Sequence, residues 1–149
     1  MRSRCYPFGD TLPATGTARE VAPGVCWLRM ALPFALDHIN LWLLRDRIDG
    51  LDGWSVVDCG IANDATRGAW EQVFASQLQG LPVLRVIVTH MHPDHIGLAH
   101  WLCERWSAAS VPGAGPSQAG DSPLGGQRSA EGASVGAREC RLWISATAW

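Results

Sequence analysis

The sequence has little that would place the protein in a membrane or on a nucleic acid. No apolar run approaches the length that a bilayer-spanning helix requires. No apolar segment of the secretory type follows Arg2 and Arg4, so we expect no signal peptide. The net charge is −2 and the basic residues are scattered, which leaves nucleic-acid binding without an electrostatic footprint. We therefore expect neither a membrane nor a nucleic acid among the partners.

No CxxC pair is present in the sequence. The five cysteines are widely spaced, at Cys5, Cys26, Cys59, Cys103 and Cys140. An odd number at such spacings predicts free thiols in a reducing compartment, and hence a cytoplasmic location. Cys59 directly follows Asp58 at the end of an expected strand, and packing is favoured there over a role as a thiol ligand.

The chain has 149 residues, enough for one domain with a sizeable core, and its composition divides it into four parts. Residues 1–23 carry scattered proline and glycine and are expected to form an irregular N-terminal arm. Residues 24–106 alternate strand and helix patterns. Residues 107–140 are rich in Gly, Ser, Ala and Pro, which predicts a disordered insertion. Residues 141–149 resemble a further strand that is cut short.

Within residues 24–106 the apolar pattern predicts strands that pair as hairpins, followed by a crossover helix. The expected strands cover residues 24–32, 39–44, 54–58 and 84–88. Asn63 or Asp64 can cap the helix. Its expected buried stripe is Trp70, Val73, Phe74 and Leu78. This order predicts a mixed α/β fold.

Three histidines and one aspartate fall within six positions after the last of these strands. His90 and His92 are two residues apart, so in extended backbone both rings point to the same side and can hold one metal ion. Pro93 disfavours helical backbone at His92 and predicts a turn. Asp94 and His95 then emerge from that turn and can face a second ion. Asp94 is also a candidate N-cap for the helix that follows. Imidazole and carboxylate are ligands that zinc takes in water-activating sites.

Three segments of the chain resemble a known family. The run from Thr89 to Gly97 is similar to the T-H-x-H-x-D-H-x-G signature of the metallo-β-lactamase superfamily. Ser55 to Gly60 resembles the family strand that ends in V-D-x-G, and Ile39 to Leu44 resembles the strand before it. The resemblance covers about residues 24–106. It implies an α/β fold that is the N-terminal half of an αββα sandwich, a mixed sheet with flanking helices.

The resemblance also implies a set of site residues. His90 and His92 would bind the first metal ion, and Asp94 and His95 the second. Asp94 would also act in catalysis by orienting the nucleophile, and Asp58 would orient the ligand loop from behind. The ligands that the family takes from its later half have no counterpart in this sequence. Two protein ligands for each zinc leave the ions weakly held, since zinc generally takes four.

The function that follows is a metal-dependent hydrolase with up to two zinc ions, in which activated water attacks an ester, thioester or lactam carbonyl. We expect a small-molecule substrate of the acyl or thioester type, and an activity impaired by the missing ligands. The alternative is a non-catalytic fragment or pseudoenzyme of that family. A redox relative of the flavodiiron type is disfavoured, because a Glu usually stands there in place of His92. An exposed sheet face would also favour self-association.

Overall fold

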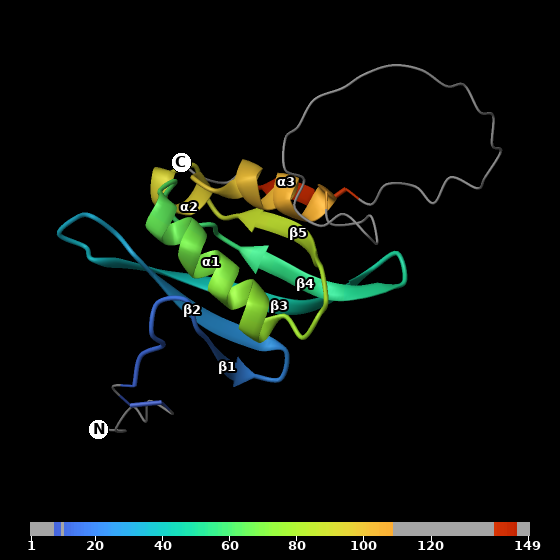
Figure 1. The fold of residues 1–149 in the computed structure, drawn as a ribbon, viewed down its shortest axis with the longest axis horizontal. Coiled ribbons are helices and arrows are strands. Elements are labelled where there is room, and N and C mark those ends of the chain that lie inside the picture. The colour runs from blue at the N-terminus through green and yellow to red at the C-terminus, as the bar shows by residue number, and fades with distance from the viewer. Residues whose placement is uncertain (1–7, 10, 109–138, 146–149) are drawn as a thin grey trace, which may run out of the picture.

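The computed structural model describes residues 8–9, 11–108 and 139–145 of the chain. Most of the predicted insertion, residues 109–138, therefore lies outside the described residues, as do residues 1–7 of the expected arm and residues 146–149 of the last part. The described elements form one six-stranded sheet with three helices on one of its faces (Figure 1).

The strands lie in the sheet in the order in which they occur along the chain. They are β1 (Ala18–Ala22), β2 (Val25–Ala31), β3 (His38–Ile48), β4 (Leu51–Val57), β5 (Val83–Val88) and β6 (Arg141–Ile144). The first four form an antiparallel meander, whereas β5 pairs in parallel with β4 and β6 in parallel with β5. The sheet is thus mixed, which confirms the predicted α/β class.

Five of the strands, β6 among them, lie where strands were expected, with boundaries that move by a few residues. The largest difference is β3, which extends beyond Leu44 to Ile48 because its second half pairs with β4 in a hairpin. The strand β1 lies inside the segment expected to be an irregular arm, and to that extent the expectation was wrong. This strand has only a weak burial alternation, so pairing with β2 rather than a local pattern fixes it.

The helices are α1 (Asp64–Gln77), α2 (Pro93–Ile96) and α3 (Ala99–Ala108). The side chain of Asn63 accepts a hydrogen bond from the Thr66 backbone N–H, as expected of an N-cap residue. The expected stripe of α1 is confirmed, with Trp70 and Val73 fully buried. None of the helices in the described part of the chain is long and apolar enough to cross a membrane.

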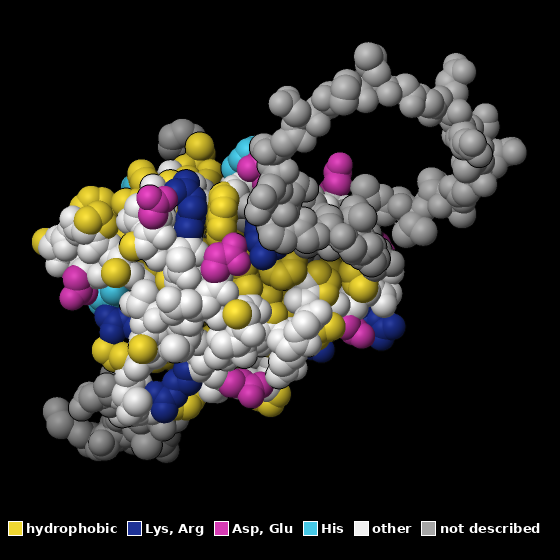
Figure 2. Space-filling model, in the orientation of Figure 1, with side chains coloured by type: hydrophobic (Ala, Val, Ile, Leu, Met, Phe, Trp, Pro, Cys, Tyr) yellow, Lys and Arg dark blue, Asp and Glu magenta, His cyan; other side chains and the backbone are white. Residues whose placement is uncertain are grey.

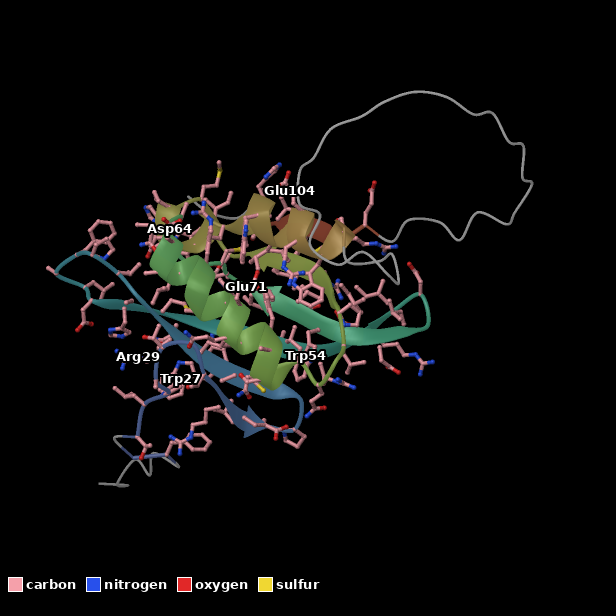
Figure 3. All side chains as sticks on the ribbon, in the orientation of Figure 1. Trp27, Arg29, Trp54, Asp64, Glu71 and Glu104 are labelled. Carbon is pink, nitrogen blue, oxygen red and sulfur yellow. The ribbon has the colours of Figure 1, made fainter. Side chains whose placement is uncertain are left out.

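The core lies between the helices and one face of the sheet. Alternate residues of β2 and β3, among them Leu28 and Leu41, are fully buried, as a strand with one covered face requires. Phe74 of α1 stacks on Trp101 of α3 at a ring distance of 6.2 Å. Glu71 of α1 forms an ion pair with Arg105 of α3, 3.0 Å between oxygen and nitrogen (Figure 3). The two helices therefore pack side by side over the sheet.

The opposite face of the sheet is covered by none of the described helices, and we call it the open face. Strand register aligns one row of apolar residues across it, because paired residues share a face. The row consists of Trp27, Trp42, Val57, Ile87 and Trp143. Trp143 is 62% exposed and the other four are partly exposed.

Figure 2 shows the helical face. There, acidic and basic side chains are interspersed among apolar ones (Figure 2). Trp54 belongs to this side, since it is buried beneath α1 and its indole N–H donates to the Leu78 carbonyl at 3.1 Å. Tryptophans of the strands therefore lie on both faces of the sheet.

Candidate metal centre

The site is built where two neighbouring parallel strands end. Because β4 and β5 run in the same direction, the residues that follow them, Asp58 and Thr89, meet at one edge of the sheet. The backbone N–H of Asp58 donates to the Ile87 carbonyl at 2.8 Å, which extends the pairing by one residue. The carboxyl ends of parallel strands are where open α/β sheets place their binding sites.

Asp58 is the centre of the hydrogen-bond network at this edge. Its side chain is buried, at 5% exposure, and its backbone has φ of 61°, which is uncommon for a residue other than glycine. The carboxylate accepts the Thr89 backbone N–H at 2.8 Å and the Thr89 hydroxyl at 2.8 Å. It also lies 2.9 Å from Nδ1 of His95. An ionised carboxylate can only accept, so Nδ1 of His95 carries a proton, and in the neutral ring Nε2 then presents its lone pair.

Thr89 links Asp58 to a second histidine, His90, by hydrogen bonds. Its hydroxyl lies 3.0 Å from Nδ1 of His90. The hydroxyl has one proton, and that proton is donated to Asp58. Nδ1 of His90 must therefore donate to the Thr89 oxygen, which leaves Nε2 of His90 free to bind a ligand as well. One buried carboxylate thus sets the tautomers of two imidazoles.

The side chains named as metal ligands lie close to one another. The ring centroids of His90 and His95 are 3.7 Å apart, and those of His90 and His92 are 4.7 Å apart. Oδ2 of Asp94 lies 3.5 Å from Nε2 of His95. His92 is exposed, whereas the other three are partly buried. His90 therefore lies beside both His92 and His95, and Asp94 lies beside His95, while the role of these four as ligands stays a prediction.

Local backbone geometry explains how the loop places them. Pro93 opens α2 after the extended residue His92, as its fixed φ favours at the first position of a helix. The N-cap position belongs to His92, whose carbonyl accepts the N–H of His95 at 2.9 Å. Asp94 lies inside the first turn, so the expectation that it caps the helix was wrong. Its carboxylate instead faces His95.

The glycine that ends the motif is required by close packing. A Cβ built at Gly97 would lie 2.5 Å from the Pro93 carbonyl oxygen, 2.7 Å from the Ala62 nitrogen and 2.8 Å from the Gly60 carbonyl oxygen. All three are backbone atoms, which cannot rotate away. The carbonyl of His95 also accepts the Cys59 N–H at 2.8 Å. The ligand loop is therefore packed directly onto the segment that follows β4.

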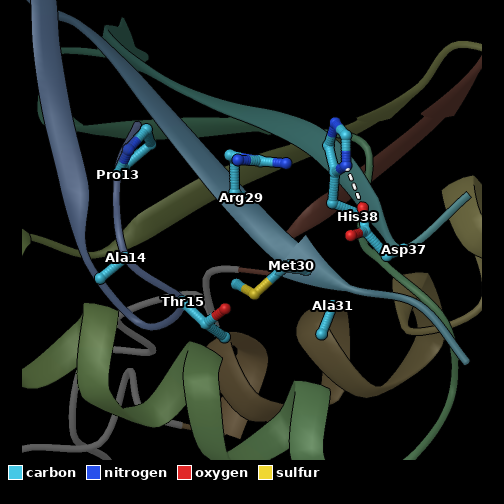
Figure 4. Close-up of a pocket in the computed structure, with 8 residues that line it drawn as sticks. All are labelled: Pro13, Ala14, Thr15, Arg29, Met30, Ala31, Asp37 and His38. Atoms are coloured by element: carbon cyan, nitrogen blue, oxygen red, sulfur yellow. Dashed lines mark hydrogen bonds and ion pairs between the residues drawn. The ribbon is translucent and has the colours of Figure 1, made fainter. Parts of the chain in front are cut away.

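The remaining donor-type residues are placed elsewhere or are poorly suited to a metal. His38 pairs with Asp37 at 2.6 Å and lines a cavity of about 270 Å³ together with Arg29 (Figure 4). His100 is exposed and lies 3.3 Å from Glu104. Burial raises the pKa of the Cys59 thiol, and the negative charge of Asp58 adds to that shift, so Cys59 keeps its proton.

The donor types at the loop fit zinc, but their number falls short of a complete shell. Imidazole nitrogen and carboxylate oxygen are ligands that zinc takes. Within residues 8–9, 11–108 and 139–145, no three His, Cys, Asp or Glu side chains converge so as to hold an ion. Sequence reasoning did not anticipate the part played by Thr89. The only signal was its place at the start of the motif.

Comparison with known proteins agrees with the sequence resemblance. A family model described as the metallo-beta-lactamase superfamily matches residues 35–134. The crystal structure of a beta-lactamase domain protein from Burkholderia ambifaria shares 68% identity over 70% of this chain, with a TM-score of 0.67. A metallo-beta-lactamase family protein from Thermus thermophilus shares 32% identity over 56% of this chain, with a TM-score of 0.46. The chain spans 33% of the first structure and 27% of the second. No match was found among curated proteins.

Proposed function

Because the chain belongs to the metallo-beta-lactamase superfamily, we propose that its loop from Thr89 to Gly97 is the metal-binding part of a zinc-dependent hydrolase. Members of the superfamily usually bind metal ions, often zinc. The observation that carries the proposal is the buried Asp58, which engages Nδ1 of His95 directly and Nδ1 of His90 through Thr89, so that Nε2 of each ring lies outside these hydrogen bonds. A histidine free to rotate or to exchange tautomers would not be prepared for a metal in this way.

Each residue of the loop has a distinct role in this proposal. His90 and His92 hold one ion, and Asp94 and His95 hold a second. Bound zinc supplies Lewis-acid activation of water and of a carbonyl oxygen. The partly buried carboxylate of Asp94 accepts a hydrogen bond from the attacking water and so orients it. Asp58 fixes His95, and through Thr89 it fixes His90.

The proposed substrate is a small molecule with an activated acyl carbonyl, namely an ester, a thioester or a lactam. A thioester is favoured, because the strand pattern of residues 39–44 and 55–60 resembles the thioesterase branch of the family. In the described part of the chain, no residue is a candidate for selecting among these substrates. The substrate class is therefore assigned by the chemistry of the metal loop.

A second candidate function is that of a non-catalytic family member with a weak metal site. It is favoured by the absence, among the described residues, of any group of three donors able to hold an ion. Two protein ligands per ion leave most of the shell to water, which predicts fast metal loss and impaired turnover. The two candidates differ in zinc affinity and in turnover.

The test measures zinc and hydrolysis on the same purified protein. Tight stoichiometric zinc, together with hydrolysis of a chromogenic ester, thioester or cephalosporin, supports the enzyme. Zinc below stoichiometry that a chelator removes at once, with no turnover, supports the non-catalytic member. His92→Ala should abolish turnover and weaken zinc binding, whereas the matched control His100→Ala should change neither, because His100 lies on the exposed surface of α3. Equal zinc affinity in both variants would refute the ligand assignment.

We further propose that the isolated chain self-associates with a second copy through the open face. The aligned apolar row that ends in the exposed Trp143 supports this, since exposed apolar patches mark interaction surfaces. Sedimentation velocity over a range of concentrations tests it. Trp143→Ser should shift the chain towards monomer, and Leu12→Ser, a change at another exposed apolar residue, should not. A monomer at all concentrations would overturn the proposal.

A cytoplasmic location is proposed from the cysteines. The four that are described, Cys26, Cys59, Cys103 and Cys140, are free thiols, which suits a reducing compartment. Cell fractionation tests this, and recovery of the protein in an extracellular or periplasmic fraction would refute it.

A further inference from the structure

Two cysteines far apart in the sequence meet beside α3. Cys103 lies on that helix and Cys140 directly precedes β6, and each thiol shifts the pKa of the other through a side-chain interaction. The backbone N–H of Cys140 donates to Oγ of Ser107 at 2.9 Å, which ties the start of β6 to the same helix. The strand β6 in turn pairs with β5 beneath α3 (Figure 1). These contacts therefore hold Cys140 beside the helix that carries Cys103, with Ser107 one helical turn from Cys103.

The pair differs from the other described cysteines in accessibility. Cys103 and Cys140 are only partly buried, whereas Cys26 and Cys59 are buried. All four are free thiols in this structure. A thiol must be reached by solvent to react with a small oxidant, so accessibility selects the first two. Adjacent sulfur atoms on well-placed backbones are also the condition for forming a disulfide without large movement.

The contact between the two thiols also assigns their chemical roles. The hydrogen bond from Cys140 lowers the pKa of the Cys103 thiol, because it stabilises the thiolate. The same contact raises the pKa of Cys140, and burial adds to that effect. The thiolate is the reactive form of cysteine. These directions favour Cys103 as the attacking residue and Cys140 as the resolving one.

We propose that Cys103 and Cys140 form a redox modification site that closes to an intramolecular disulfide when the chain meets a small-molecule disulfide. The Cys103 thiolate attacks one sulfur of the oxidant, forming a mixed disulfide and releasing one thiolate. Cys140 then gives up its proton and attacks the Cys103 sulfur, which releases the second thiolate. Overall, two protein thiols become one disulfide, and the oxidant is reduced to two thiols. Neither cysteine belongs to the proposed metal loop, and the proposal does not depend on hydrolase activity.

The bridge would act as a covalent tie between α3 and the edge of the sheet. All four residues of β6 are exposed, so this edge strand has little burial of its own to hold it in place. Closing the chain between positions 103 and 140 also restricts the unfolded state, which stabilises the folded protein. The oxidised protein should therefore unfold at a higher temperature than the reduced protein.

The experiment equilibrates the purified chain with mixtures of reduced and oxidised glutathione, followed by alkylation and peptide mass mapping. We expect a Cys103–Cys140 cross-link that forms with increasing oxidant and disappears with dithiothreitol. We also expect an unfolding midpoint several degrees higher in the oxidised sample. With iodoacetamide, Cys103 should be alkylated several-fold faster than Cys26 at neutral pH.

Variants provide the matched controls. Cys103→Ser and Cys140→Ser should each abolish the cross-link and the shift in midpoint, whereas Cys26→Ser should leave both unchanged. The peptide mass map of the unaltered chain shows whether the Cys103–Cys140 cross-link forms, even if a variant fails to fold. A bridge that includes Cys59, a disulfide only between two chains, or thiols that stay reduced in excess oxidised glutathione would each overturn the proposal.

Discussion

The replacement Asp58→Asn removes one charge from beneath the metal loop and leaves the shape of the side chain almost unchanged. Asparagine adopts positive φ at least as readily as aspartate, so the unusual backbone at this position is not penalised further. The amide keeps one accepting oxygen, which can serve the Thr89 N–H. Its NH2 group then faces Nδ1 of His95, which must become an acceptor. The proton of His95 moves to Nε2, the atom proposed to bind the metal.

The expected change in unfolding free energy follows from the hydrogen bonds that are altered. Hydrogen bonds to a charged group contribute about 1.5–3 kcal/mol each, and neutral ones about 0.5–1.5 kcal/mol. Asp58 accepts from Thr89 through both its N–H and its hydroxyl, and from His95. Converting these to neutral bonds costs about 3 kcal/mol, partly offset because a buried charge is no longer desolvated. We expect a net loss in unfolding free energy of about 1–3 kcal/mol. Loss of such an orienting partner also lowers metal affinity by about 10–100-fold.

Three measurements test this prediction on the same pair of proteins. Urea denaturation without metal gives the change in unfolding free energy, and zinc titration against a competing chelator gives the change in affinity. Nitrogen NMR chemical shifts of the imidazoles give the tautomers. Asp64→Asn is the matched control, since Asp64 is an exposed carboxylate that forms a surface ion pair with Arg67. If His95 keeps its proton on Nδ1 in Asp58→Asn and zinc affinity is unchanged, the proposed role of Asp58 is refuted.

Two further predictions concern stability. Gly97→Ala should destabilise the protein by about 1–3 kcal/mol, because its Cβ would meet three backbone atoms. Gly68→Ala, in the open on α1, should stabilise it by about 1 kcal/mol in the same urea titration, and equal effects would contradict the packing argument. Burial raises the pKa of Asp46, but hydrogen bonds from Ser55 and Arg85 outweigh it and hold the pKa below its ordinary value. The stabilisation that Asp46 contributes is therefore present above about pH 4 and is lost as the pH falls through the lowered pKa. Asp46→Asn should lower the free energy of unfolding at pH 7, and in acid the variant and the parent should have the same free energy of unfolding. A constant difference across that range would exclude the linkage.

Much of the central fold could be predicted from local sequence patterns. Asn63 before a helical stripe predicted the start of α1, because capping depends on the residue and its immediate neighbours. Strands β2 to β5 followed from apolar alternation, since one face of each is buried. The strand β1 and the full length of β3 were missed. Both are fixed by hydrogen bonds to a neighbouring strand, which leave little trace in local composition.

The motif identified the residues of metal-ligand type, but not the contacts that hold these residues in position. Spacing alone put His90 and His92 on one side and turned the chain at Pro93. It did not reveal that Thr89 links Asp58 to His90, or that Gly97 must lack a side chain to pack against the segment after β4. Those contacts join residues about thirty positions apart and exist only once the strands have paired.

The sequence by itself determined the α/β class, the membership of a family and the chemistry of the candidate site, because periodicity and a dense ligand motif are local properties of the chain. Tertiary structure alone decided which nitrogen of His95 faces Asp58 and which cysteines lie near each other. It also decided which tryptophans line the open face. Each of these depends on the register between strands and on the packing of α3, and therefore on distances that no single stretch of sequence contains.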